Sequence, residues 1–247
     1  DESEKYLPEK SSGWWNRIFV DDFDGDGDSD LVIGNTGLNF QFKVSDEKPA
    51  KLLYADFDGN GSMDPFIFAY VQDSLWPLAS RDEALDQMIS LRKKFTDYKS
   101  YARTSMKDLL TTDQIAQAGM LNAVRFQTSY LENKGDPFEY RELPVQAQFA
   151  PVFAIASFDF DADGKKDLFL GGNMQHVRIR FGKSDANYGT LLKGDGHGSF
   201  TYISQRESGL SIRGDVRDAF VMHTPAGDFL TITVNQQPLQ MYRIGEK

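Results

Sequence analysis

The sequence predicts an all-β protein built from repeated antiparallel sheets, with one helical insertion. Three stretches of the 247-residue chain repeat one pattern: a short apolar run, a nine-residue acidic loop and a second short apolar run. Short apolar runs bounded by Gly and Asn are typical of strands buried on both faces, so each loop is expected to join two strands as a hairpin. A helical period appears in one region, at about residues 73–121.

The three acidic loops share their spacing. They begin at Asp22, Asp56 and Asp159 and place a carboxylate or amide oxygen at positions 1, 3, 5 and 9. Each has phenylalanine at position 2 and glycine at position 6, where a sharp turn needs a residue without Cβ. So many negative groups in one short loop repel one another unless a cation lies between them.

Calcium fits these loops, because Ca²⁺ accepts about six to eight oxygen ligands in loose geometry. We therefore predict three Ca²⁺ sites, in which the side chains at positions 1, 3, 5 and 9 and the carbonyl at position 7 are ligands. The predicted ligands are Asp22, Asp24, Asp26, Asp28 and Asp30 in loop one, Asp56, Asp58, Asn60, Ser62 and Asp64 in loop two, and Asp159, Asp161, Asp163, Lys165 and Asp167 in loop three.

Two other interpretations fit the loops less well. Solvated Asp-Gly turns would not be expected three times with the same phenylalanine. An EF-hand has a bidentate Glu at position 12 and continues into a helix. Position 12 here is Ile33, Ile67 or Leu170, within a short apolar run. The ion is therefore expected to fix a β-turn and not to move a pair of helices.

Composition limits the classes of function. The formal net charge of -10 argues against a nucleic-acid partner, and the absence of cysteine excludes disulfides and Cys-zinc sites. No apolar run reaches the length of about eighteen residues that a membrane-spanning helix needs. Low-affinity Ca²⁺ sites fill outside the cytosol, so we expect an extracytoplasmic protein. The polar start of the chain has no signal-peptide core, which predicts a mature or trimmed form.

The first half of the chain predicts two blade-like units. In the first, strands flank loop one, and an alternating run follows over 38–42. The second holds loop two, and the helical insertion at about 73–121 interrupts it. Strands at 123–131 and 138–143 are assigned to complete this second unit.

Capping boxes predict where the helices of the insertion begin. Ser80 with Glu83 starts the first, and Thr111 with Gln114 starts the last. A helix around 98–110 would align Lys99, Arg103 and Lys107 as a basic stripe, which is more often a solvated face than a docking surface.

The second half predicts two further units. The third unit, 150–204, begins with loop three and has a second turn at 194–198. The fourth, 212–244, has strands near 218–223, 229–234 and 239–244. Its entry, 214–218, lacks the loop oxygens, so no metal is expected there. The tripeptide at 213–215 reads Arg-Gly-Asp, which we interpret as a coincidence.

The pattern of strand, D-F-D-x-D/N-G-x-x-D, strand and Gly-Asn resembles the FG-GAP/VCBS repeats of integrin α-subunit heads and of many bacterial surface proteins. The stretches 143–151, 171–173, 191–200 and 214–218 are similar to the bacterial branch related to cartilage acidic protein, which is associated with ASPIC/UnbV. The resemblance implies a β-propeller with calcium loops inside its blades and no catalytic residues. Four units could close on themselves or belong to a larger ring, for example a seven-bladed one, which the resemblance favours.

These features lead to one functional hypothesis with two alternatives. The hypothesis is a non-catalytic, calcium-binding scaffold of an exported or cell-surface protein, expected to be bacterial, that binds a protein or a glycan. The first alternative is a polysaccharide lyase or glycosidase on a calcium-stabilised propeller, which would need a base or paired carboxylates away from the loops. The second is a calcium sensor, which the hairpin setting makes the weakest of the three.

Overall fold

The computed structural model describes residues 1–247 apart from 9, 136, 179–180 and 246–247. The described chain is mostly β, with four antiparallel sheets of three or four strands and a few short helices. This fits the propeller-like fold with small helical insertions that the repeats predict. The chain forms two compact units, one of residues 1–41 and 126–247 and one of residues 42–125.

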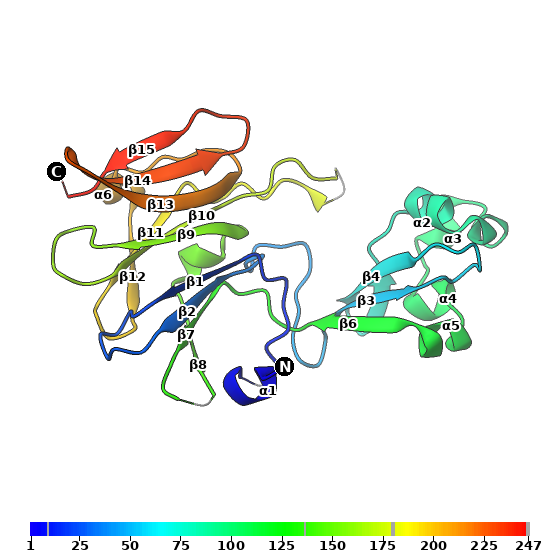
Figure 1. Ribbon diagram of the computed structural model, residues 1–247. Coiled ribbons are helices and arrows are strands. Elements are labelled where there is room, and N and C mark those ends of the chain that lie inside the picture. The colour runs from blue at the N-terminus through cyan, green and yellow to red at the C-terminus, as the bar shows by residue number, and fades with distance from the viewer. Residues whose placement is uncertain (9, 136, 179–180, 246–247) are drawn as a thin grey trace. The chain divides into compact units, whose positions relative to one another are not determined.

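The first unit contains three sheets, each with its strands in up-and-down order from one edge. Sheet one has the order β1-β2-β7-β8, sheet two β9-β10-β11-β12 and sheet three β13-β14-β15 (Figure 1). The strands are β1 (Arg17–Asp21), β2 (Asp30–Gly34), β7 (Ser129–Glu132), β8 (Glu139–Arg141), β9 (Val152–Phe158), β10 (Asp167–Gly172), β11 (Thr190–Gly194), β12 (Phe200–Ile203), β13 (Val216–Thr224), β14 (Gly227–Val234) and β15 (Gln240–Arg243).

Sheet two lies between the other two sheets of this unit, because its first strand contacts both β1 and β13. Side chains alternate between the two faces of a strand. Ile155 therefore packs towards sheet one, while Ala154 and Ala156 pack towards sheet three. All three are almost fully buried. The apolar run over this strand thus reflects burial on both faces, as the sequence predicts. The prediction is wrong for β1, where Ile18 and Val20 are 60% and 54% exposed on one open face.

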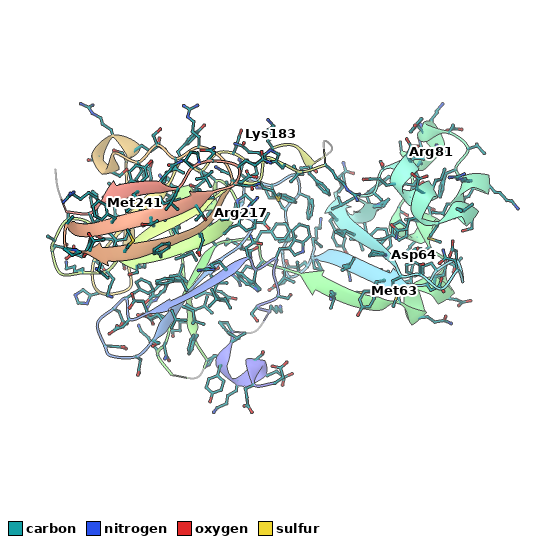
Figure 2. All side chains as sticks on the ribbon, turned by 45° about the horizontal axis from the view of Figure 1, so that its top comes forward. Met63, Asp64, Arg81, Lys183, Arg217 and Met241 are labelled. Carbon is teal, nitrogen blue, oxygen red and sulfur yellow. The ribbon has the colours of Figure 1, made fainter. Side chains whose placement is uncertain are left out.

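Sheet three has one face packed on sheet two and one face partly open. Leu230 and Ile232 of β14 belong to the core shared with sheet two. On the opposite face Phe220 and Met241 are 47% and 45% exposed. Figure 2 shows Met241 and Arg217 on this sheet.

The second unit is one sheet with a layer of short helices. Its strand order is β5-β4-β3-β6, and the helices come between β5 and β6 in the chain. Phe66 and Phe68 of the sheet share a core with Leu85 and Leu91 of the helices and with Met88, which lies between these two helices. The elements are β3 (Ala50–Ala55), β4 (Asp64–Val71), β5 (Ser74–Pro77), α2 (Arg81–Gln87), η1 (Ile89–Lys93), α3 (Tyr98–Tyr101), α4 (Met106–Leu109), α5 (Thr112–Gln117) and β6 (Gly119–Ala123).

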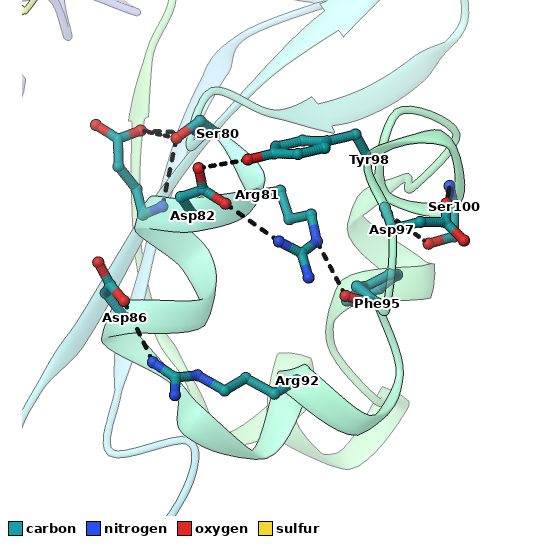
Figure 3. A network of polar contacts seen from close by, with 10 residues as sticks. Ser80, Arg81, Asp82, Asp86, Arg92, Phe95, Asp97, Tyr98 and Ser100 are labelled. Atoms are coloured by element: carbon teal, nitrogen blue, oxygen red, sulfur yellow. Dashed lines mark hydrogen bonds and ion pairs between the residues drawn. The ribbon is translucent and has the colours of Figure 1, made fainter.

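The predicted capping boxes are confirmed at both ends of the helical region. Ser80 and Glu83 satisfy each other's backbone amides at the start of α2, and Thr111 and Gln114 do so at the start of α5. Figure 3 shows how α2 is tied to the segment that follows η1: Nε of Arg81 donates to the carbonyl of Phe95 at 3.0 Å.

The prediction of one continuous helix over 98–110 is wrong. The segment is divided into α3 and α4, because Ser105 is extended (φ -77°, ψ 173°) and starts a second capping box with Asp108. Lys99, Arg103 and Lys107 therefore do not form the i, i+4 stripe of one helix. The four-residue spacing of the basic side chains predicts one helix, but the capping box at Ser105 starts a new helix within it.

Two strand predictions are also corrected. The strands expected at 123–131 and 138–143 do not complete the second unit, because β7 pairs with β2 and β8 pairs with β7. Sheet one is thus interrupted in sequence by the whole second unit, whose own β6 pairs with β3. The alternating run at 38–42 is irregular, and Gly37 before it has φ +81°. The remaining short helices are α1 (Ser3–Tyr6), η2 (Val145–Gln148) and α6 (Gln205–Ser208).

Candidate metal centres

Each acidic loop joins two adjacent antiparallel strands. Loop one connects β1 to β2, loop two β3 to β4, and loop three β9 to β10. The position-9 aspartate is the first residue of the second strand in every case: Asp30, Asp64 and Asp167. The expected hairpins are therefore confirmed, and none of the three loops leads into a helix.

The position-9 carboxylate holds the start of its own loop. Oδ2 of Asp30, Asp64 and Asp167 accepts the amide of the position-2 phenylalanine, at 3.1, 3.0 and 2.6 Å respectively. All three aspartates are almost fully buried. Since the ladder fixes the backbone of these residues, the sheet itself sets where their carboxylates point.

The position-2 phenylalanine anchors each loop to a core. In loop one, Phe23 is 2% exposed and meets Tyr130 edge-on, with 5.9 Å between ring centroids. In loop two, Phe57 packs against Phe66 at 6.2 Å. In loops one and two this aromatic side chain is buried in the core, while in every loop the aspartates on either side of position 2 belong to the carboxylate cluster.

Position 1 caps the turn from the opposite side. In loop two, Asp56 accepts the amides of Asn60 and Gly61 at 3.0 and 2.8 Å. In loop three, Asp159 accepts the equivalent pair at 3.1 and 2.7 Å. In loop one, Asp22 accepts the amides at positions 4 and 6, at 2.7 and 3.2 Å. The backbone at position 6 favours glycine, because its φ angle is +94°, +87° and +84° in the three loops.

Three carboxylates converge in every loop. In each, the aspartates at positions 1, 3 and 9 offer oxygens that lie within 4.8 Å of one another. Two oxygens on opposite sides of a Ca²⁺ ion, each bound at about 2.4 Å, are about 4.8 Å apart, so the spacing suits one shared ion. The three groups are Asp22, Asp24 and Asp30; Asp56, Asp58 and Asp64; and Asp159, Asp161 and Asp167.

The predicted ligands at positions 5 and 7 are not part of these groups. One side-chain oxygen of Asp26, Asn60 and Asp163 accepts the amide at position 7, at 2.9, 2.8 and 3.0 Å. This bond shapes the turn and leaves the second oxygen of each aspartate for other partners. The ligand role of these side chains, and that of the carbonyls of Asp28, Ser62 and Lys165, stays a prediction.

The electrostatics of the loops favour a cation. Burial raises the pKa of Asp64, and the neighbouring carboxylates of Asp58 and Asp56 raise it further against the hydrogen bond from Phe57. Burial likewise raises the pKa of Asp24 and of Asp167. These carboxylates are therefore costly to ionise without a partner.

One buried oxygen supports the fit most directly. Within the described part of the chain, Oδ1 of Asp58 is buried and has no hydrogen-bond partner. Such an atom carries an unfavourable desolvation cost. It belongs to the carboxylate cluster of loop two, where a bound hard cation would satisfy it.

Loop three contains an internal cation that the sequence does not reveal. The ammonium of Lys193 on β11 pairs with Asp161 and, at 2.9 Å, with Asp163. These ion pairs raise the pKa of Lys193 and lower that of Asp163. Among the described residues, no lysine or arginine pairs with the clustered aspartates of loops one and two.

Loop one has a different neighbour from its third strand. The hydroxyl of Tyr130 donates to Asp30 at 2.8 Å, and burial raises the pKa of this tyrosine. Glu132 lies two residues after Tyr130 on β7. It is buried and pairs with Lys134 at 3.1 Å and Arg141 at 2.6 Å. Only the strand register could have identified these residues from the sequence.

The Arg-Gly-Asp tripeptide is not displayed as a recognition loop. Asp215 is 2% exposed, and its carboxylate accepts the amide of Gln175 at 2.8 Å and pairs with Arg217 at 3.1 Å. The interpretation of this match as a coincidence is therefore supported.

The first unit also contains a cavity of about 570 Å³. It lies between sheets two and three, next to loop three. Its lining combines aromatic and aliphatic side chains with two arginines, and includes Phe158, Phe160, Asp161, Arg206, Tyr242 and Arg243.

Comparison with known proteins agrees with the geometry of loop one. Residues 14–45 match the FG-GAP repeat, a segment that contains β1, the first acidic loop and β2. No curated protein matches the chain. Among the described residues, no helix is long and apolar enough to cross a membrane. The chain thus contains an FG-GAP repeat, in a mostly β fold whose acidic clusters could hold calcium.

Proposed function

We propose that this protein is a non-catalytic, calcium-stabilised β-propeller scaffold that binds a protein or glycan ligand. Three Ca²⁺ ions bind in the acidic loops, through the side chains at positions 1, 3, 5 and 9 and the carbonyl at position 7. The observation that carries the proposal is the convergence of three carboxylates in each loop, with an unpartnered buried oxygen on Asp58.

The donor set favours calcium over other metals. Every predicted ligand is an oxygen, and carboxylate and carbonyl oxygens suit hard cations such as Ca²⁺. Loops two and three lie outside the FG-GAP match, but their position-9 aspartates make the same bond to position 2 as that of loop one. Their equivalence in contacts supports three sites of one kind.

The setting of the loops supports a structural role for the ion. Both ends of each loop lie in one antiparallel ladder, so an ion held by positions 1 and 9 fixes a hairpin. FG-GAP repeats occur in extracellular or surface proteins, where Ca²⁺ is abundant. We therefore place the protein outside the cytoplasm, in a bacterium, within the ASPIC/UnbV-associated branch that its later motifs resemble.

The cavity beside loop three is our candidate for the ligand site. Aromatic side chains such as Phe160 and Tyr242 can stack on a sugar ring or pack on an apolar peptide side chain, and Arg206 can pair with an anionic group. An array of neutral and acidic glycans, probed with the wild type and Arg206→Ala, tests this assignment. Acidic glycans should bind the variant less well.

Calcium titration tests the metal claim. After treatment with EDTA, isothermal titration should give three Ca²⁺ per chain, and melting in Ca²⁺ should occur at a higher temperature than in EDTA. The double variant Asp159→Ala with Asp161→Ala should lose one site. Its melting temperature should fall somewhat in EDTA, because Asp159 accepts the amides of Asp163 and Gly164, and should fall further relative to the wild type in Ca²⁺. No heat of binding together with an unchanged melting temperature would refute the proposal.

A screen on acidic and neutral polysaccharides separates the scaffold from the enzyme alternative. Turnover that co-purifies with the wild type and persists after repurification would favour a lyase or glycosidase.

A further inference from the structure

Loops one and three each have a charged residue nearby on the strand that pairs with the second strand of the hairpin. This residue is Glu132 of β7 at loop one and Lys193 of β11 at loop three, so the two charges have opposite signs. In the ladder of β2 with β7, Leu31 lies opposite Leu131, so the register continued by one residue leads to Asp30 and Glu132. In the ladder of β10 with β11, Leu168 lies opposite Leu192, and the same step leads to Asp167 and Lys193. In both sheets the residue that follows donates its amide to Oδ1 of that aspartate: Asn133, just after β7, at 2.8 Å, and Gly194, the last residue of β11, at 2.9 Å. Glu132 and Lys193 therefore occupy the same place in two copies of one site.

Lys193 brings an ammonium group to the ligands of site three. Its Nζ pairs with Asp161 at position 3 and with Asp163 at position 5. The side chain of Lys193 is 35% exposed, and those of the two aspartates are 26% and 27% exposed. Because Lys193 belongs to the ladder of β11 and not to the loop, the fold holds its backbone beside the cluster whether or not an ion is bound.

We propose that Lys193 is a built-in competitor for the calcium ion of site three, so that this site fills at a higher Ca²⁺ concentration than site one. The inference rests on the calcium function proposed above. An ammonium and a divalent ion repel each other strongly at a separation of a few ångströms. Calcium can therefore bind Asp161 and Asp163 only after Lys193 has turned away from them.

The same contact keeps loop three neutralised when Ca²⁺ is scarce. Lys193 offsets the repulsion among Asp159, Asp161 and Asp167, whereas no described lysine or arginine pairs with the clustered aspartates of loop one. Site three thus becomes a low-affinity site in a hairpin that does not need the ion in order to stay folded, and the protein responds to calcium in two steps.

The glycine at position 6 gives each loop its own reporter. The amides of Gly27, Gly61 and Gly164 donate to the position-1 carboxylates, at 3.2, 2.8 and 2.7 Å. A calcium titration of the full chain, followed by ¹H–¹⁵N correlation spectra of these three amides, therefore measures each site separately. In the wild type, the midpoint of Gly27 should lie at a lower Ca²⁺ concentration than that of Gly164.

Three variants test the role of Lys193. Lys193→Gln should lower the midpoint of Gly164 about tenfold and leave that of Gly27 unchanged, because a partly exposed charge contact is removed from one site only. Lys193→Arg keeps the charge and should stay within about threefold of the wild type. Lys166→Gln is the matched control: it removes one charge from the same loop, where Lys166 pairs with Asp21 at 3.1 Å, and should also stay within about threefold.

The outcomes separate this inference from the proposed function. If the Gly164 midpoint in Lys193→Gln is unchanged or higher while Gly27 titrates normally, the competitor role is overturned and the calcium function stands. If none of the three glycines responds to Ca²⁺ in the wild type, the calcium function itself fails. If Lys193→Gln does not fold, Lys193→Met keeps the aliphatic part of the side chain and is judged by the same midpoint.

Discussion

Replacing Asp58 by asparagine should separate calcium binding from folding at site two. Oδ1 of Asp58 is buried without a hydrogen-bond partner among the described residues, and Asp56 and Asp64 are its neighbours in the cluster. In EDTA, Asp58→Asn therefore removes a charge that repels the two neighbouring carboxylates. It breaks no hydrogen bond of Oδ1, because this oxygen has none in the described part of the chain. The free energy of unfolding in EDTA should stay constant or rise by up to about 1 kcal/mol.

In calcium the same variant should be less stable than the wild type. A site filled at about one hundred times its dissociation constant adds roughly 2.7 kcal/mol to the free energy of unfolding. For a chain of this size, 1 kcal/mol corresponds to about 2–4 °C. The melting temperature of Asp58→Asn in Ca²⁺ should thus lie about 5–10 °C below that of the wild type.

Calorimetric melts in EDTA and in Ca²⁺ measure both effects, and titration should give two Ca²⁺ per chain instead of three. Asp64→Asn is the informative comparison, because Asp64 is 2% exposed and accepts the amide of Phe57 at 3.0 Å. It should lose stability in EDTA as well. Asp86→Asn is the control: this exposed carboxylate pairs with Arg92 on the surface, and its loss should change stability by less than about 0.5 kcal/mol in either buffer. A stoichiometry of three ions in Asp58→Asn would refute this role of Asp58. So would a melting temperature that lies equally far below that of the wild type in EDTA and in Ca²⁺.

Three further changes have effects that urea denaturation in EDTA can measure. Ala162 has φ +61° at position 4, where the other loops have glycine, so Ala162→Gly should raise the free energy of unfolding by about 0.5–1 kcal/mol; a lower midpoint would contradict the strain. Tyr130→Phe removes a hydroxyl that donates to buried Asp30 and should cost about 1–2 kcal/mol; no change would mean that water replaces it. Asp215→Ala removes the buried acceptor of the Gln175 amide and of the partly exposed Arg217, and should cost about 1–3 kcal/mol; an unchanged midpoint would contradict this role.

Features encoded by neighbouring residues were predictable from the sequence. The loops follow from the spacing of oxygens and glycines, and the strands that flank them follow from apolar runs. The helix start at Ser80 was predictable because its partner, Glu83, is three residues away. In each case the residues that determine the conformation lie within one short segment.

Strand partners were not predictable in the same way. Residues 129–132 read as a strand, but their period is the same whichever sheet they join. The hydrogen bond from Tyr130 to Asp30 spans 100 residues of sequence, across an entire inserted unit. Residues 129–132 are close in sequence to the second unit, which favoured their assignment to it. They join sheet one instead, where Tyr130 packs in the core with Phe23 and Val32.

The same limit applies to the sites. The aspartates at positions 1, 3 and 9 come from one loop, so their convergence could be expected. Lys193 lies on a separate strand, and only the register of β11 brings it to loop three. Sequence spacing therefore identifies the ligands of such a site but not the residues that set its affinity.

The three sites differ in what holds them together without an ion, and this predicts where calcium matters most. Site three has Lys193, and site one has Tyr130 and the amide of Asn133. In the described structure no such donor from a third strand reaches Asp64 of site two, whose hydrogen bonds come from its own loop. Hydrogen exchange of residues 56–64 should therefore accelerate in EDTA, relative to Ca²⁺, more than that of residues 159–167. Equal acceleration of the two loops would show that the third strand contributes nothing to holding them, and the distinction between the sites would fall.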